Sequence, residues 1–145
     1  PLPDGILRVD RVSVGAPTDI TLGHYTLPQP GHDKLPAAVR TAGKHQATTV
    51  TGTDYTLAMV PLMGWDQPAE VIYPKGLHPV SNVCALPTLR QHVEGTRIFV
   101  TLQLWKKGAS FTDRELQPVK AVKVSKDQRT VVVTLATGEK KTVRF

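Results

Sequence analysis

The sequence predicts an all-β protein, an antiparallel β-sandwich of about nine strands with a three-stranded meander at its C-terminal end. The 145 residues include 18 Val and 17 Thr, whose branched side chains pack well on a pleated sheet and lose freedom in a helix. Twelve Pro and 11 Gly interrupt the chain every few residues, which leaves few windows long enough for a helix. Short alternating segments between turn residues favour an antiparallel sandwich over a parallel α/β sheet.

The first five predicted strands are bounded by proline and glycine. Pro17 ends the first strand, and Pro74 ends the fifth. The five ranges are 6–14, 19–27, 45–52, 55–61 and 70–73. The connection 32–44 is predicted to hold a single helical turn at 35–40, and the proline-rich stretch 74–87 is predicted to be irregular.

The strongest strand signal lies at 96–105, where both faces of the predicted strand carry apolar side chains. One face has Ile98, Val100, Leu102 and Leu104, and the other includes Phe99. Strands that are apolar on both faces are typical of sheets covered on two sides. We therefore expect a central strand with a layer above it and a layer below it.

The C-terminal meander is predicted from three alternating segments, 119–125, 130–136 and 141–145. Polar turns at 126–129 and 137–139 separate them. Val143 and Phe145 are predicted to point the same way, and Lys140 and Arg144 to point to the opposite face.

Length and composition indicate one soluble, basic domain over residues 1–145. The net charge is +6, and no apolar run reaches the about 18 residues that a membrane span needs, so no membrane partner is expected. The single cysteine, Cys84, excludes an internal disulfide framework. The chain opens on Pro1 with no initiator Met or visible signal peptide, so either it was processed or it is a piece of a longer chain. The resemblance described below favours the second interpretation.

No pattern in the sequence predicts catalysis, a cofactor or a metal site. The five histidines lack the close spacing of zinc ligands, although His24, His32 and Asp33 come nearest to it. Cys84 lies among apolar residues and is interpreted as a small buried side chain rather than a nucleophile. Neither a Gly-x-Ser-x-Gly elbow nor a glycine-rich phosphate loop is present.

The candidate binding residues are basic and aromatic. Basic side chains concentrate at Trp105-Lys106-Lys107 and along the meander, where Lys140 and Arg144 would give one sheet face a positive charge. A basic face attracts polyanions, but lysines on a sheet edge also prevent edge-to-edge aggregation, and this second interpretation is favoured. Aromatic rings that could stack on a sugar are also present. The candidate set is Trp65, Tyr73, Trp105, Lys106, Lys107, Lys140 and Arg144.

Three segments, 6–12, 95–102 and 130–145, resemble in order and spacing the C-terminal β-sandwich of bacterial polysaccharide lyases of the heparinase II/III-like kind. They carry Val9-Asp10-Arg11-Val12, then Phe99-Val100-Thr101-Leu102, and finally a hairpin that ends on Val143-Arg144-Phe145. The resemblance implies an accessory sheet domain beside an N-terminal helical domain that supplies most of the catalytic residues. None of those catalytic residues is matched here. The resemblance also implies a periplasmic or secreted protein that acts on uronate-containing polysaccharide.

The function expected from the sequence is thus a non-catalytic β-sandwich domain of a bacterial polysaccharide lyase. The alternative is a free-standing module that binds carbohydrate or another polyanion. A small enzyme that uses Cys84 or the histidines is a third hypothesis. Nucleic-acid binding rests on charge alone, without any recognised module, and is not favoured.

Overall fold

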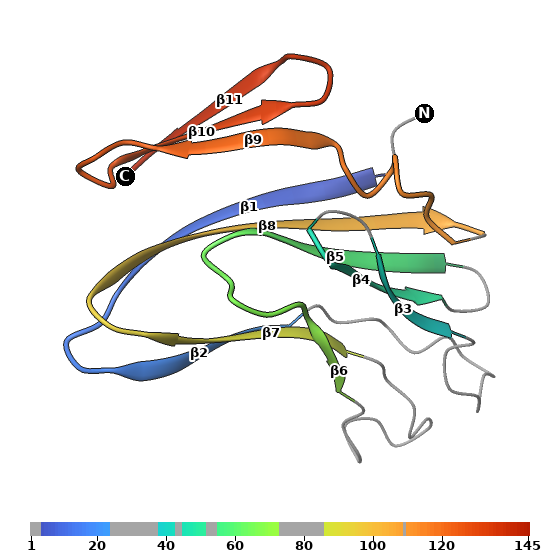
Figure 1. Ribbon diagram of the computed structural model, residues 1–145, viewed down its shortest axis with the longest axis horizontal. Helices are drawn as coiled ribbons and strands as arrows, with labels where there is room; N and C mark the ends of the chain where they lie inside the picture. Colours follow the sequence, from blue (N-terminus) through green and yellow to red (C-terminus); the bar gives the residue numbers. More distant parts are fainter. Residues whose placement is uncertain (1–3, 24–37, 43–44, 52–54, 73–85, 109) are drawn as a thin grey trace.

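The computed structural model is a stack of three β-sheets (Figure 1). It describes residues 4–23, 38–42, 45–51, 55–72, 86–108 and 110–145. Every regular element in these ranges is a strand, and every strand pair is antiparallel. The predictions of an all-β fold and of a C-terminal three-stranded sheet are confirmed.

The strands form a central sheet of five, in the order β1-β8-β5-β4-β3, and two sheets of three. The lower sheet has the order β2-β7-β6, and the C-terminal sheet has the order β11-β10-β9. The strand bounds are β1 Asp4–Ser13, β2 Thr18–Gly23, β3 Ala38–Ala42, β4 Ala47–Thr51, β5 Tyr55–Met63, β6 Glu70–Ile72, β7 Leu86–Val93, β8 Thr96–Lys107, β9 Val119–Val124, β10 Thr130–Leu135 and β11 Lys140–Arg144.

A single bent ribbon connects the central and lower sheets. β1 pairs with β8 in the central sheet, and their continuations β2 and β7 pair in the lower sheet. At the corner, the backbone N–H of Val14 donates to the carbonyl of Gly95 at 2.9 Å, and Pro17 precedes β2. Because both chains bend together, the lower sheet folds under the central sheet (Figure 1).

Strand β8 is buried on both faces, as its sequence predicts. Ile98, Val100, Leu102 and Leu104 pack in the core shared with the C-terminal sheet. Phe99, on the other face, is 1% exposed and contacts the ring of Trp65. The central sheet is therefore covered above and below.

The C-terminal sheet covers the central sheet with its valines. Val119, Val131 and Val133 are buried in the same core cluster as the β8 residues. Phe111 and Leu116, from the segment that leads into β9, extend this cover. The C-terminal sheet is the uppermost sheet in Figure 1.

The helical turn predicted at 35–40 is wrong where the structure describes it. Residues 38–40 belong to β3, which pairs with β4 in the register Val39 opposite Val50. Pairing with a sheet edge gives this backbone its hydrogen bonds and overrides a weak local helical preference. Residues 35–37 lie outside the described ranges.

The predicted strand set also lacks β7, the middle strand of the lower sheet. Residues 86–87, predicted to be irregular, begin this strand, and Pro87 opposes Val71 of β6. The alternation of β7 is hidden because two of its buried positions, Thr88 and Gln91, are polar. Gln91 follows Leu89 on the inner face and is 8% exposed, since its side-chain amide bonds to Asp66.

Candidate polyanion-binding surface

Most of the net charge of the protein lies in its C-terminal sheet and the two turns of that sheet. Residues 119–145 carry seven basic side chains and two carboxylates, so five of the six net positive charges are found there. The basic residues are Lys120, Lys123, Lys126, Arg129, Lys140, Lys141 and Arg144. The +6 charge is therefore a local property of one sheet rather than a diffuse one.

Strand register places three of these cations on the outward face. Val131 and Val133 point into the core, so the residues between and beside them on β10 point away from it. Lys123 is opposite Val132, Lys140 is opposite Thr134, and Arg144 is opposite Thr130. The basic face, as we define it, consists of Lys123, Lys140 and Arg144 with Thr130, Val132, Thr134 and Thr142.

The cations of the basic face are exposed and have no partner in the described part of the chain. Lys123, Lys140 and Arg144 are all solvent-exposed, and no ion pair or hydrogen bond of their side chains is found among the described residues. Lys120 is also exposed, but it lies at the β-bulge of β9, where no paired position places it on this face. The positive potential of the face is thus uncompensated.

The two carboxylates of this region lie in or next to its two turns and have partners there. Asp127 accepts hydrogen bonds from the hydroxyl of Ser125 and the backbone N–H of Arg129, and these bonds lower its pKa, with Ser125 the largest cause. Glu139 forms an ion pair with Lys141 at 2.5 Å. Lys141 is opposite the core residue Val133 and so belongs to the inner face of β11.

The edge strands and the packed inner face both bear on how this charge is distributed. β9 and β11 are the two edges of the C-terminal sheet, and lysines on an edge strand discourage further pairing. Because the inner face packs on the core, the exposed cations of the edge strands fall on the outer face. No strand position of that face carries a carboxylate, so the face has a positive potential that attracts anions.

The residues Trp105, Lys106 and Lys107, by contrast, do not form one site. Trp105, opposite Leu57, and Lys107, opposite Tyr55, point to the lower face of the central sheet. Trp105 is partly buried and Lys107 is exposed. Lys106 points to the upper face and is held there by Glu115.

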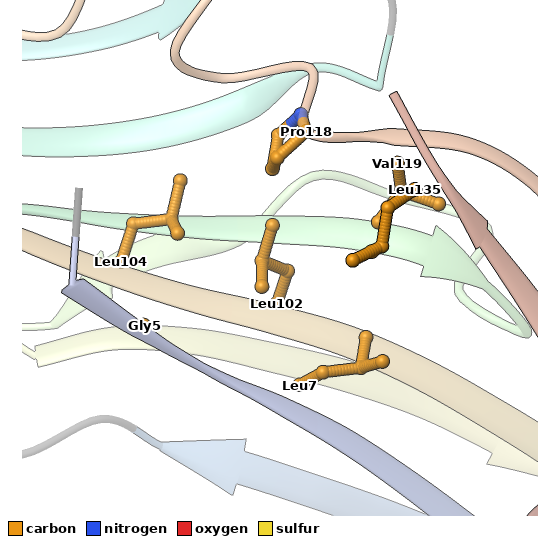
Figure 2. A pocket seen from close by; sticks show the side chains of 7 residues that line it. All are labelled: Gly5, Leu7, Leu102, Leu104, Pro118, Val119 and Leu135. Atoms are coloured by element: carbon orange, nitrogen blue, oxygen red, sulfur yellow. The ribbon is translucent and has the colours of Figure 1, made fainter. Parts of the chain in front are cut away.

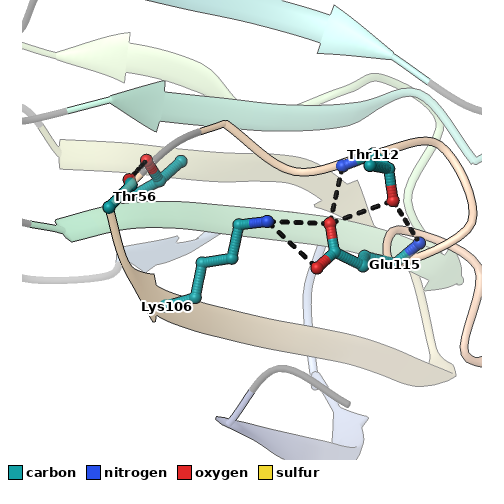
Figure 3. A network of polar contacts seen from close by, with 5 residues as sticks. Thr56, Lys106, Thr112 and Glu115 are labelled. Atoms are coloured by element: carbon teal, nitrogen blue, oxygen red, sulfur yellow. Dashed lines mark hydrogen bonds and ion pairs between the residues drawn. The ribbon is translucent and has the colours of Figure 1, made fainter. Parts of the chain in front are cut away.

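The Lys106–Glu115 pair forms a structural clasp (Figure 3). The Lys106 ammonium donates to both carboxylate oxygens of Glu115, at 3.0 and 2.8 Å, and lies 5.1 Å from the centre of the Phe111 ring. The backbone N–H of Thr112 donates to Glu115 at 2.7 Å, and the N–H of Glu115 donates back to the Thr112 hydroxyl at 3.3 Å. This reciprocal pair is a capping box, which the Thr-x-x-Glu spacing could have revealed.

Acid is expected to weaken this clasp. Hydrogen bonds from Lys106, then from the backbone of Thr112, lower the pKa of Glu115 from 4.5 to about 2. A carboxyl with a lowered pKa contributes stability above its unfolded pKa, and that contribution is lost as the pH falls from about 4.5 to 2. After allowance for solvent screening of a pair that is about one quarter exposed, we expect Glu115→Gln to cost about 1–2 kcal/mol at pH 7.

Urea unfolding at pH 7 and near pH 2 measures this effect. The difference between wild type and Glu115→Gln should shrink toward zero in acid. Glu139→Gln, which removes an exposed carboxylate from an ion pair of two half-exposed side chains, is the control and should change stability little at either pH. A Glu115→Gln deficit that persists in acid would contradict the charge-based account of the clasp.

The indole of Trp65 also makes contacts within the protein. Its Nε1–H donates to the Thr101 hydroxyl at 2.9 Å, and its ring centre lies 4.4 Å from that of Phe99. The next residue, Asp66, accepts hydrogen bonds from Gln91 and Arg97, which lower its pKa in that order. Tyr73, the remaining aromatic candidate, lies outside the described residues.

A small apolar pocket lies between the central and C-terminal sheets (Figure 2). It has a volume of about 150 Å³, and Figure 2 shows Leu7, Leu102 and Leu104 pointing toward Pro118 and Leu135 across it. None of the lining residues has a polar side chain that could orient a substrate. The described residues contain no group of three or more metal-binding side chains and no helix able to cross a membrane.

The candidate residues thus separate into three places. Lys140 and Arg144 lie together on the basic face, Trp105 and Lys107 lie on the lower face of the central sheet, and Lys106 and Trp65 make internal contacts. Lys123, which the sequence shows only as part of the basic meander, joins the basic face through its register with Val132. Comparison of the chain with protein-family models, curated proteins and solved structures gave no match.

Proposed function

We propose that this protein is a non-catalytic β-domain that holds anionic polysaccharide on the basic face of its C-terminal sheet. The observation that carries the proposal is the alignment of Lys123, Lys140 and Arg144 on one exposed face without a carboxylate. Uronate and sulfate groups on a polysaccharide would meet uncompensated positive charge there. The threonine hydroxyls between the cations can donate to and accept from sugar hydroxyls.

We further propose that the domain belongs to a bacterial polysaccharide-degrading enzyme of the lyase kind, in the periplasm or outside the cell. The support is the resemblance of the three segments, two of which lie side by side as β1 and β8, while the third forms the β10–β11 hairpin. The catalytic residues would then come from a helical domain of the same polypeptide. The encoding reading frame tests this proposal: an upstream helical region is expected, and a start codon directly before Pro1 would contradict it.

Removal of the three cations is expected to abolish most polysaccharide binding. The triple variant Lys123→Gln, Lys140→Gln, Arg144→Gln should bind heparin or polygalacturonate at least about tenfold more weakly, because each lost ion contact removes a favourable electrostatic term. Isothermal titration at about 50 and 200 mM salt measures the loss, and the salt dependence should become shallower.

A second triple variant distinguishes the effect of the basic face from the effect of net charge. Arg90→Gln, Lys107→Gln and Arg114→Gln remove three exposed cations from other elements, so the net charge falls equally. This control should keep most of the affinity. Equal losses in both triple variants, or a wild type that binds neither polysaccharide, would overturn the proposal.

A further inference from the structure

The cations of the basic face stand on widely separated backbone positions. Lys140 and Arg144 are four residues apart on β11, which separates their Cα atoms by about 13 Å at the usual rise of a strand. Side chains on a sheet stand roughly perpendicular to it, so side chains that extend straight out keep their charged groups about as far apart as their Cα atoms. A single carboxylate or sulfate needs donors within about 3 Å of its oxygens.

Lys123 completes a nearly equilateral triangle with these two residues. It lies on β9, two strands away from β11. Lys123 is opposite Val132, which is opposite Thr142, and Thr142 lies midway between Lys140 and Arg144 on β11. With about 4.8 Å between strands and two residues of offset, its Cα lies about 12 Å from each of the other two. Any two of the three cations are therefore separated by almost the same gap.

The surface between the cations suits a sugar chain. Thr142 lies between Lys140 and Arg144 on β11, and Thr130 and Thr134 lie on the neighbouring strand. These positions offer hydroxyls and the methyl groups of Val132, and residues 119–145 place no aromatic ring on this face. Single-stranded nucleic acid is usually held by stacking of its bases on aromatic side chains, so the face favours an anionic polysaccharide.

We propose that the basic face recognises an extended anionic polysaccharide whose charges bridge two cations about 12–13 Å apart, so that chain length sets the affinity. The inference rests on the proposed function and specifies its ligand. A chain that reaches two cations binds the second one intramolecularly and gains affinity without any new kind of contact. A disaccharide, too short to bridge the gap, gains nothing from the second cation.

Size-fractionated heparin tests the inference, with affinity compared per anionic group. An octasaccharide should bind at least about tenfold more tightly than a disaccharide on this basis. The three cations form three pairs with nearly equal gaps. Each single variant (Lys123→Gln, Lys140→Gln or Arg144→Gln) leaves one of these pairs, so its affinity for the octasaccharide should fall only about threefold. Any double variant should reduce octasaccharide binding to the disaccharide level.

Lys141→Gln is the matched control for the single variants. It removes one charge from the same strand, but on the inner face and from an ion pair with Glu139, so octasaccharide affinity should stay within about twofold of wild type. A loss as large as that of Lys140→Gln would show that the face does not matter and would overturn the inference.

The remaining outcomes distinguish the two proposals. If wild type does not bind the octasaccharide, the proposed function fails and the length dependence fails with it. If the octasaccharide and the disaccharide bind equally per anionic group, the function stands and the bridging inference is wrong. If single-stranded DNA of equal charge binds as tightly and responds to the same variants, the assignment to polysaccharide is wrong.

Discussion

Gly64→Ala is expected to lower the free energy of unfolding by about 3–5 kcal/mol. Gly64 has φ +88°, a conformation that costs a residue with a Cβ about 1–2 kcal/mol. A Cβ there would also lie 2.3 Å from the Ile98 carbonyl oxygen and 2.8 Å from the Phe99 ring. The carbonyl belongs to the central strand and has no room to move, so the chain at 63–66 must shift instead.

Gly138→Ala isolates the steric part of this cost. Gly138 has φ +90°, almost the same as Gly64, but nothing lies within 4 Å of its would-be Cβ. The control should therefore lose only the conformational term of about 1–2 kcal/mol. Urea midpoints of the two variants, compared at equal m-value, measure the difference. Equal midpoints would show that the segment 63–66 moves freely away from β8.

The same close approach explains why Trp65 makes internal contacts. Because Gly64 lets the chain lie directly against β8, the following residues reach Thr101 and Arg97. The sequence Met63-Gly64-Trp65-Asp66 indicates a loop, but it carries no sign of which strand the loop touches. Only the tertiary position of β8 decides that the indole packs on Phe99 rather than facing a ligand.

The C-terminal sheet was the part most fully predictable from the sequence. Its strands alternate cleanly and its turns are short, so the inward direction of Val131 and Val133 and the outward direction of Lys140 and Arg144 follow from local pattern alone. Whether Lys123 joins the same face depends on the register between β9 and β10. Alternation within each strand is consistent with that register but does not determine which residues are opposite each other.

Two other parts of the structure depend on contacts that no local pattern records. β7 places Gln91 at a buried position because Asp66, distant in sequence, satisfies its amide. Lys106 is not a free cation, because it forms an ion pair with Glu115. In both places a polar residue has a structural partner, and a count of charges or apolar positions along one strand does not reveal partners.

Phe99→Ala is expected to cost about 3–5 kcal/mol and to expose Trp65. The ring is 1% exposed and lies on the lower face of β8, where it contacts Trp65 at 4.4 Å between ring centres. Its loss leaves a cavity between the central and lower sheets, and the backbone of β8, paired on both sides, cannot collapse into it. In a Trp105→Phe background, the emission of the remaining Trp65 should shift to the red as water reaches the indole.

Phe145→Ala removes the same side chain from a position that is 48% exposed and should cost less than about 1 kcal/mol, with Trp65 emission unchanged. The contrast between the two variants tests whether the lower sheet truly seals the second face of β8. If Phe99→Ala costs no more than Phe145→Ala, the lower sheet does not pack on the central sheet as a layer, and the bent ribbon of β1–β2 and β7–β8 would have to open at the Val14–Gly95 corner in solution.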